Sequence, residues 1–452
     1  MFQALIWLGH YLYINWSFRG VGLSKWSSSQ ANVTFISYFF NIDKNKTHNG
    51  IFKSDYWGSL PEFISEVGRK TNWLHIFVRD KNFSDAAEVT DALKRLNGVD
   101  GSHQNHIVLE CFLSLKIVAR AICDWVVVIF HAKTILHRVR NEKSNILLWP
   151  LIQDDWSESF FGISSIRNIM MFNLFEEAFS KLSTQKQGFF LLENQGWEMA
   201  MSAAWRGCRH QSLIGCPHST VRFWDLRHFF DDRIFNCPPG VNSPPLADKV
   251  AVNGPVARAA FLDSGYPLDR LVEVEALRYL YLANNERFRK KTDGARSLRL
   301  LVVGDYVAKH THRQMTLLCQ LDLAFLSSLS IIVKPHPATP INSDLYRSLN
   351  FVQSDLNISE LLASADIVFA SALTSAAVDA FCSVLPVIVS LDPDSLNLSP
   401  LRSCSGVRFI SSSKELGEAL SDLEQTKDSP YKSENFFYVD NNLHRWCELL
   451  SL

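Results

Sequence analysis

Residues 367–389 read IVFASALTSAAVDAFCSVLPVIV. The stretch begins with one apolar run, Ile367–Phe369, and ends with another, Pro386–Val389. Between them, a turn rich in hydroxyl side chains leads into a helical segment, Ala376–Cys382. Short strands that are apolar throughout are typical of parallel sheets buried on both faces. The stretch therefore predicts a strand–helix–strand unit, and with it an α/β fold.

The same alternation of apolar strands and helical segments extends over the whole chain. Further strands are expected at Phe2–Leu8, Val33–Phe39, Trp73–Val78, Gly188–Leu192, Ser212–Gly215, Leu298–Val303 and Ile331–Lys334. Helices are expected between them, for example at Phe172–Leu182, Trp197–Arg206, Arg270–Leu282 and Lys414–Leu423. Repeated units of this kind predict doubly wound parallel sheets.

A polar and basic segment divides the chain. Residues 284–297, NNERFRKKTDGARS, have the composition of a linker. They separate an N-terminal domain, residues 1–285, from a C-terminal domain, residues 298–430. Residues 431–452 end in an amphipathic helix whose apolar face would suit a return to the first domain. We expect two Rossmann-like domains that face a cleft, which is where such folds bind ligands.

The composition excludes several classes of protein. The chain has 452 residues, of which 47% are hydrophobic and 20% charged, so it is not intrinsically disordered. Its 45 basic and 46 acidic residues leave no excess of positive charge for nucleic-acid binding. Nine cysteines are scattered without a short Cys/His motif, which indicates reduced thiols in a cytoplasmic protein and no metal site.

Two apolar segments bear on membrane contact. The N-terminus lacks a basic region and a cleavage site, so a signal peptide is not expected. The segment from Ile107 to Leu136 carries Lys116, Arg120 and Asp124 at intervals of four, which places them on one polar face of a helix. This pattern favours a helix packed on a sheet. The alternative is a peripheral contact with the inner membrane through the apolar face.

In the second domain, polar side chains follow the predicted strands. The strand Ile331–Lys334 runs into Pro335-His336-Pro337, and the prolines preset the position of the histidine. His336 could donate to a phosphate oxygen with Lys334 nearby, or serve as a turn residue. Candidate ligands of a phosphate or ribose lie on two further loops: Asp305, Ser371, Thr374, Ser375 and Asp379. Alternatively, the hydroxyls could cap the helix, and Asp379 could be an ordinary surface acid.

In the first domain, two loops at the carboxyl ends of strands carry candidate catalytic groups. Glu193 follows the strand Gly188–Leu192 and precedes a helix, so it is the candidate general base; the alternative is a helix-capping or surface acid. Glu198, in the first turn of that helix, is interpreted as stabilising the helix dipole. His218 follows the next strand and is an acceptor ligand, a phosphate contact, a second candidate base or a structural histidine.

These elements together resemble the nucleotide-binding domain of GT-B glycosyltransferases, in particular bacterial enzymes that use CMP-activated acidic sugars such as sialic acid or Kdo. By resemblance, His336 and Pro337 match the His-Pro motif, and Ser371, Thr374 and Ser375 match the hydroxyl motif. Asp379 stands where many GT-B enzymes carry a ribose-binding Glu, so it departs from the pattern. Further stretches, among them 37–43, 56–58 and 72–75, resemble bacterial surface-carbohydrate biosynthesis proteins, and the stretch 252–279 resembles the interdomain approach of GT-B enzymes, so the likeness spans nearly the whole chain.

The resemblance implies a metal-independent transferase without a cofactor. It would move a CMP-activated 2-keto sugar acid, Kdo or a nonulosonic acid, to a surface-polysaccharide acceptor that is free or lipid-linked. Two alternatives stay open. The donor could be a UDP- or GDP-sugar or CDP-glycerol, or the chain could be a non-catalytic glycan-binding subunit.

Overall fold

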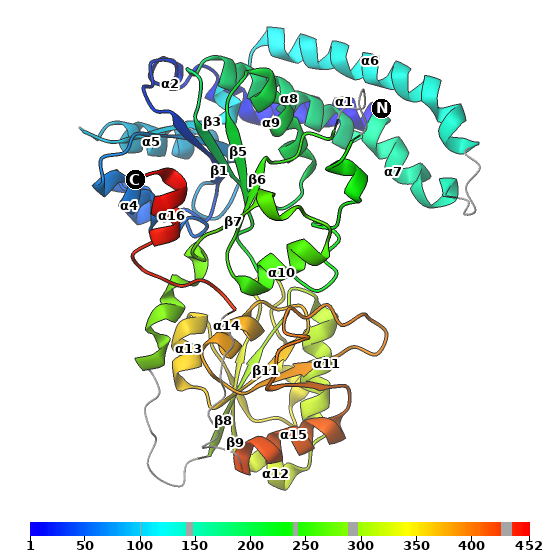
Figure 1. The fold of residues 1–452 in the computed structure, drawn as a ribbon. Coiled ribbons are helices and arrows are strands. Elements are labelled where there is room, and N and C mark those ends of the chain that lie inside the picture. Colours follow the sequence, from blue (N-terminus) through cyan, green and yellow to red (C-terminus); the bar gives the residue numbers. More distant parts are fainter. Residues whose placement is uncertain (100, 142–147, 238–242, 288–296, 426–435) are drawn as a thin grey trace.

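The computed structural model describes the chain except for residues 100, 142–147, 238–242, 288–296 and 426–435. Part of the expected linker, residues 284–297, therefore lies outside the described residues. Two parallel sheets organise the molecule, one in each half of the chain (Figure 1). All of their named strand pairs are parallel.

The first sheet has seven strands in the order β3-β2-β1-β4-β5-β6-β7. These are β1 (Val33–Phe39), β2 (Thr71–Phe77), β3 (Gln104–Val108), β4 (Gln187–Leu191), β5 (Ser212–Cys216), β6 (Lys249–Val252) and β7 (Leu271–Glu273). The helices of this half are α1 (Phe2–Asn15), α2 (Leu23–Ser27), α3 (Lys44–His48), α4 (Leu60–Glu66), α5 (Ala86–Asn97), α6 (Leu115–Arg140), α7 (Trp149–Phe161), α8 (Ile163–Ser180), α9 (Gly196–Gly207) and α10 (Pro255–Asp263). Short 3-10 helices include η2 (Leu109–Phe112) and η5 (Leu277–Arg287).

The second sheet has six strands in the order β10-β9-β8-β11-β12-β13. These are β8 (Leu298–Val303), β9 (Leu329–Lys334), β10 (Phe351–Gln353), β11 (Ile367–Ser371), β12 (Val387–Ser390) and β13 (Val407–Ile410). The helices are α11 (Ala308–Cys319), α12 (Leu323–Ser327), α13 (Ile358–Ser364), α14 (Ala376–Cys382) and α15 (Ser413–Gln425). Counted from its first strand, the second sheet has the order 3-2-1-4-5-6, which is the Rossmann order, and the first sheet has the same order with a seventh strand beyond the sixth. The predicted pair of Rossmann-like domains is confirmed.

Aromatic residues fill the core of the first domain. The Phe35 ring stacks between Trp73 and Phe189, with centroids 4.4 Å and 5.0 Å away. Trp57 packs edge-on against Phe35 at 5.0 Å. The thick layer of rings explains much of the Phe and Trp content of the sequence. It also gives the strands that carry the candidate site a rigid base.

The C-terminal helix, α16 (His444–Leu450), lies against the first domain (Figure 1). The Trp446 indole is buried, and its Nε1 donates to the backbone oxygen of Glu275 at 3.0 Å. Gln187, at the start of β4, donates to the carbonyl of Leu449 at 2.7 Å. The chain therefore returns from the second sheet to the first one at its end.

Three expected elements are wrong. Phe2–Leu8 is not a buried strand but the start of α1, whose apolar side chains are largely exposed. Arg270–Leu282 is not one helix, because β7 and η5 occupy this region. The helix expected from Ile107 begins only at Leu115, since residues 104–108 pair with β2 as an edge strand. At Phe2–Leu8 a short apolar run did not distinguish strand from helix.

Candidate active site

The Glu193 carboxylate lies at the carboxyl edge of the first sheet, two residues after β4. Tyr38 comes from the neighbouring strand β1, and its hydroxyl donates to Glu193 Oε2 at 3.2 Å. That hydroxyl in turn accepts a hydrogen bond from Trp197 Nε1 at 3.2 Å. Burial and the nearby Glu193 carboxylate raise the pKa of Tyr38, so the phenol keeps its proton and can go on donating. The hydrogen bonds from Trp197 to Tyr38 and from Tyr38 to Glu193 thus fix the position of Glu193 Oε2.

His218 faces the other oxygen of Glu193. It follows β5, and its Nε2 lies 3.5 Å from Glu193 Oε1. The edge of the Tyr56 ring packs on the imidazole at 4.7 Å. Burial lowers the pKa of His218 to about 4, and the positive charges of Arg278 and Arg227 act in the same direction. The ring is therefore neutral at neutral pH, and its buried Nδ1 has no hydrogen-bond partner within the described part of the chain.

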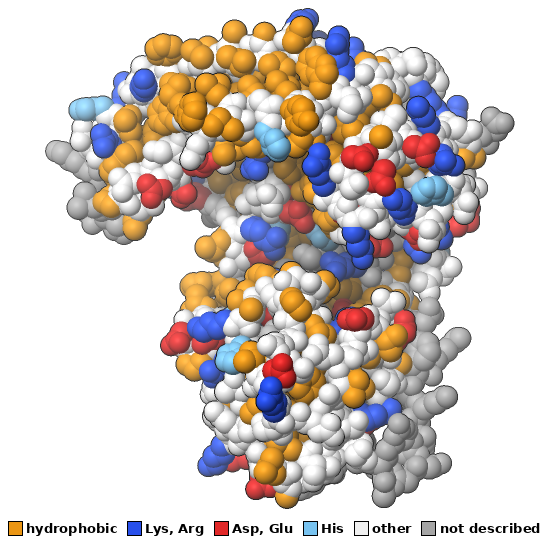
Figure 2. All heavy atoms as spheres, turned by 180° about the vertical axis from the view of Figure 1, so that it is seen from behind, with side chains coloured by type: hydrophobic (Ala, Val, Ile, Leu, Met, Phe, Trp, Pro, Cys, Tyr) orange, Lys and Arg blue, Asp and Glu red, His pale blue; other side chains and the backbone are white. Residues whose placement is uncertain are grey.

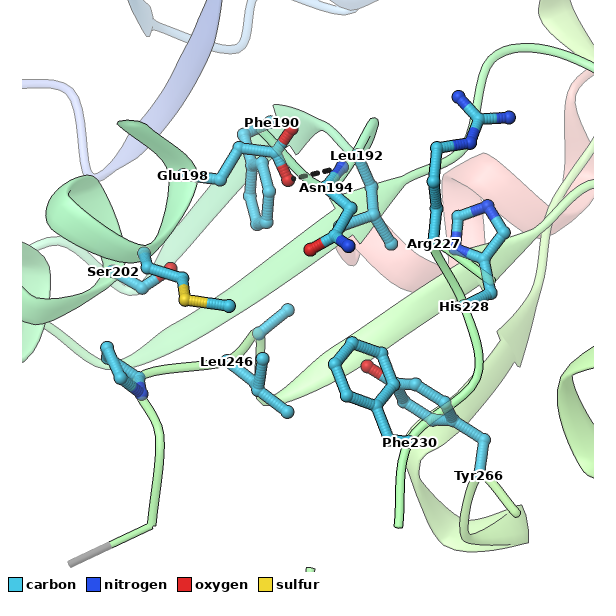
Figure 3. Close-up of a pocket in the computed structure, with 13 residues that line it drawn as sticks. Phe190, Leu192, Asn194, Glu198, Ser202, Arg227, His228, Phe230, Leu246 and Tyr266 are labelled. Atoms are coloured by element: carbon cyan, nitrogen blue, oxygen red, sulfur yellow. Dashed lines mark hydrogen bonds between the residues drawn. The ribbon is translucent and has the colours of Figure 1, made fainter. Parts of the chain in front are cut away.

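Glu198 holds the loop that carries Glu193 through hydrogen bonds to the backbone amides of that loop. This buried carboxylate accepts from the backbone amides of Glu193 at 2.9 Å, Asn194 at 3.1 Å and Gln195 at 3.0 Å. Figure 3 shows the bond to Asn194. It forms a capping box at the start of α9. Burial raises the pKa of Glu198 to about 7. The sequence interpretation of Glu198 was a contact with the helix dipole; the structure instead shows these hydrogen bonds to the backbone, which set the backbone position of the candidate base.

A pocket lies beside this loop, between α9 and the segment after β5 (Figure 3). Asn194 and Arg227 supply polar groups to its wall, and Phe230 and Tyr266 supply aromatic rings. Asp225 holds the guanidinium of Arg227 with two hydrogen bonds, at 2.8 Å and 2.6 Å. The pocket therefore combines fixed hydrogen-bonding groups with ring faces, next to Glu193.

In the second domain, His336 has a fixed ring. Its Nδ1 accepts from the backbone amide of Ala338 at 3.1 Å, so the proton of the neutral ring is on Nε2, which is then a donor. Gly304, after β8, donates its amide to the carbonyl of Lys334 at 2.9 Å. A Cβ at Gly304 would lie 3.1 Å from the backbone nitrogen of His336, so a side chain there would require the two loops to move apart by a few tenths of an ångström. Pro337, next to His336, is exposed.

Lys334 has a different partner from the one expected. Its ammonium group donates to the carbonyl of Leu356, beyond β10, at 2.6 Å. If Lys334 attracts a bound phosphate, its ammonium group does so from this position beside the Leu356 carbonyl.

Asp305 and Ser371 are both buried, which does not match their predicted role as ligands of a nucleotide. The sequence suggested that both would contact a bound nucleotide, but the Asp305 side chain is 0% exposed. Its oxygens accept from the amide of Val307 at 2.9 Å and from the hydroxyl of Ser371, and Oδ2 lies 3.3 Å from His310 Nδ1. Ser371 is buried as well. The two residues therefore join the loops after β8 and β11 and support the site from inside.

Thr374 and Ser375 remain half-exposed at the turn before α14. The Ser375 side chain makes no capping hydrogen bond to α14, so capping does not account for it. Asp379, one turn further on, is buried, and its Oδ1 has no hydrogen-bond partner among the described residues. Burial raises the pKa of Asp379 to about 7, although Arg278 and the Tyr281 hydroxyl oppose the shift.

Arg278 is a residue that the sequence reasoning missed. It lies in η5, between the two sheets in sequence, and lines a pocket together with Tyr56 and His218. Its charge lowers the pKa of His218 in the first domain and opposes the rise at Asp379 in the second. One cation therefore acts on both halves of the candidate site. In the sequence, the indication for Arg278 was its position within residues 252–279, which resemble the interdomain approach of GT-B enzymes.

Two cation–π contacts join the domains near these loops. The Arg222 guanidinium lies 5.6 Å from the centroid of Tyr306, the residue after Asp305. The Arg402 guanidinium lies 4.2 Å from the centroid of Phe223. The segment after β5, which begins with His218, thus meets the loops of the second domain. Figure 2 shows the molecule hollowed where the two domains meet, with charged side chains in the hollow.

Two Rossmann-like domains whose carboxyl-end loops meet define the GT-B architecture, and the expected fold class is confirmed. No protein-family model and no curated protein matches the sequence. Solved structures with a similar course of the chain include a UDP-GlcNAc 2-epimerase from Neisseria meningitidis bound to UDP-GlcNAc (TM-score 0.47, 10% identity, 89% of this chain and 94% of that chain). A second is a trehalose 6-phosphate synthase from Burkholderia multivorans (TM-score 0.46, 10% identity, 88% of this chain and 90% of that chain). A third is MurG from Acinetobacter baumannii (TM-score 0.39, 9% identity, 88% of this chain and 91% of that chain).

Proposed function

We propose that this protein is a glycosyltransferase that moves a sugar from a nucleotide donor, held by the second domain, to a glycan acceptor held by the first. The carrying observation is the Glu193 carboxylate, fixed by Tyr38 and adjacent to a neutral His218 at the carboxyl edge of a parallel sheet. Carboxylates placed in this way can take a proton from a hydroxyl group in the transition state.

The reaction assigns one task to each side of the site. The acceptor hydroxyl oxygen attacks the anomeric carbon of the donor while its proton passes to Glu193. The bond from that carbon to the phosphate oxygen breaks, and the nucleotide leaves with the electron pair. His336 Nε2 and the hydroxyls of Thr374 and Ser375 donate to the leaving phosphate, an electrostatic stabilisation that a preset ring supplies without reorganisation.

For the donor we propose a CMP-linked 2-keto sugar acid, Kdo or a nonulosonic acid, and for the acceptor a surface-polysaccharide glycan. Support comes from the His-Pro turn after β9 and the Thr374–Ser375 hydroxyls after β11, on the two strands that flank β8.

A donor panel with one matched pair of variants tests the proposal. The full chain is incubated with CMP-Kdo, a CMP-nonulosonate, UDP-GlcNAc, a GDP-sugar and CDP-glycerol, and release of the nucleotide is measured. We expect release from the CMP-sugars only, and a fall of at least about 100-fold in Glu193→Gln, which keeps the shape of the side chain but cannot accept the proton. Glu66→Gln, on the exposed end of α4, is the control and should match the wild type.

Two results would contradict the proposal in different ways. Release from a UDP-sugar, a GDP-sugar or CDP-glycerol alone would replace the donor but keep the transferase. Binding of glycan without release from any donor, unchanged in Glu193→Gln, would identify a non-catalytic subunit.

A further inference from the structure

The end of the first domain remote from the second one carries an extended apolar surface. Helix α6 packs on α8 through a stripe of buried side chains: Ile117, Ala121, Trp125, Ile129 and Ala132. A second set of apolar side chains on α6 is exposed: Leu115, Ile122, Val126, Val127, Phe130 and Ile135. Of these, Phe130 is 64% exposed and Leu115 73%. A water-soluble surface helix does not need this second stripe.

Helix α1 extends the same surface. It also packs on α8, and it contains no Asp, Glu, Lys or Arg. Phe2, Leu5, Ile6 and Tyr13 are exposed on it, with Phe2 77% exposed. Figure 2 shows hydrophobic side chains gathered over this end of the molecule. We call the exposed apolar side chains of α1 and α6 the apolar cap.

The charges on α6 itself are mostly positive, whereas the neighbouring α7 carries Asp154, Asp155 and Glu158. Helix α6 carries five cations, Lys116, Arg120, Lys133, Arg138 and Arg140, against one acid, Asp124. Asp124 and Glu176 pair with Arg120. Among the described residues neither Lys133 nor Arg138 has an acidic partner, and both are exposed near Phe130 in sequence. Apolar side chains that alternate with free cations are the pattern of a helix that lies in a membrane interface.

We propose that the apolar cap docks on the surface of an anionic bilayer, with α6 in the plane of the interface. The aromatic and aliphatic side chains would enter the boundary between headgroups and acyl chains, and Lys133 and Arg138 would pair with lipid phosphates. No helix in the described part of the chain is long and apolar enough to cross a membrane, so the contact is with the surface alone. A second copy of the chain is a poorer partner, because a symmetric contact would bring two basic α6 helices together.

Vesicle flotation with the full chain tests this docking, and it needs no sugar donor, so its outcome is independent of the proposed reaction. Vesicles of phosphatidylcholine alone are compared with vesicles containing phosphatidylglycerol at about one third of the lipid. We expect binding to the anionic vesicles that weakens as salt is raised. The double variant Val127→Gln/Phe130→Gln should lower the partition coefficient at least about tenfold. The variant Lys133→Gln/Arg138→Gln should lower it several-fold on anionic vesicles only.

A matched control separates docking from general stickiness. Leu345→Gln/Leu396→Gln removes two equally exposed leucines from the second domain and should leave binding unchanged. Circular dichroism shows whether each variant is folded, and light scattering gives its oligomeric state. The proposal is overturned if the wild type floats with neither vesicle, or if the control variant loses as much binding as Val127→Gln/Phe130→Gln. A dimer of the wild type that becomes a monomer in that variant would assign the apolar cap to a second copy instead.

Discussion

At the scale of single residues, acids that look alike in the sequence have opposite surroundings. Glu193 and Asp305 both follow a buried strand, yet Glu193 keeps a quarter of its side chain exposed while Asp305 has none. The difference comes from neighbours distant in sequence. Tyr38 and His218 face Glu193 at the rim, whereas Ser371 and His310 surround Asp305. Sequence position therefore located both loops but could not show which acid faces a ligand.

Asp379 gives a prediction about pH dependence. Its pKa is raised by burial from an ordinary 3.8 to about 7. As pH rises, the Asp379 carboxyl therefore ionises in the unfolded chain before it ionises in the folded protein. The stability contribution of the neutral carboxyl is complete below about pH 4 and is lost by about pH 7, up to ~4 kcal/mol. Asp379→Asn lacks this titration. Its free energy of unfolding relative to the wild type should therefore increase between pH 4 and pH 7 and stay constant above pH 7.

Urea unfolding at several pH values, without donor, measures that difference. Asp344→Asn, an exposed acid in the same domain, should show no such trend. A difference between Asp379→Asn and the wild type that is flat from pH 4 to pH 8 would mean that Asp379 is already ionised in the folded protein.

At the scale of elements, α16 depends on a residue 170 positions away in sequence. Glu275 is buried, and its carboxylate accepts from the backbone amides of Arg445 at 3.0 Å and Trp446 at 3.1 Å. These amides belong to the first turn of α16, which has no capping side chain of its own. The carboxylate thus caps the helix and joins it to the segment after β7. An N-cap supplied from so far along the chain has no local sequence signal.

Removing this cap should destabilise the first domain. Glu275→Ala leaves two buried amides without a partner, and we expect a loss of about 2–3 kcal/mol in the free energy of unfolding. Chemical denaturation followed by tryptophan fluorescence measures it, because Trp446 lies at the contact. Glu448→Ala, on the exposed side of the same helix, should cost less than about 0.5 kcal/mol. Equal losses in the two variants would show that the cap contributes nothing.

At the scale of the whole molecule, the central strands were the most predictable part. The expected ranges Val33–Phe39 and Leu298–Val303 coincide with β1 and β8, since both strands are covered on both faces and read as apolar runs. The edge strands β7, β10 and β13 were not expected, because they are short and only partly buried. Central strands carry the pattern of the fold, and edge strands depend on pairing partners that only the assembled sheet provides.

The candidate site was predictable in part for the same reason. In a parallel sheet the loops after neighbouring strands meet at one edge, which is why Glu193 and His218 come together as adjacent rim residues. Tyr38 and Arg278 could not be found in this way. Tyr38 acts from within a strand, and Arg278 acts from a 3-10 helix that connects the domains. Their contributions depend on three-dimensional packing and charge.

The central claim is that the second domain holds a nucleotide at His336 while Glu193 stays available for the acceptor. A crystal structure of the full chain soaked with CMP tests this most directly. We expect density for the phosphate between His336 Nε2 and the hydroxyls of Thr374 and Ser375, and none at Glu193. Nucleotide density against Glu193 and His218, or no density with CMP under conditions where UDP is bound, would contradict it.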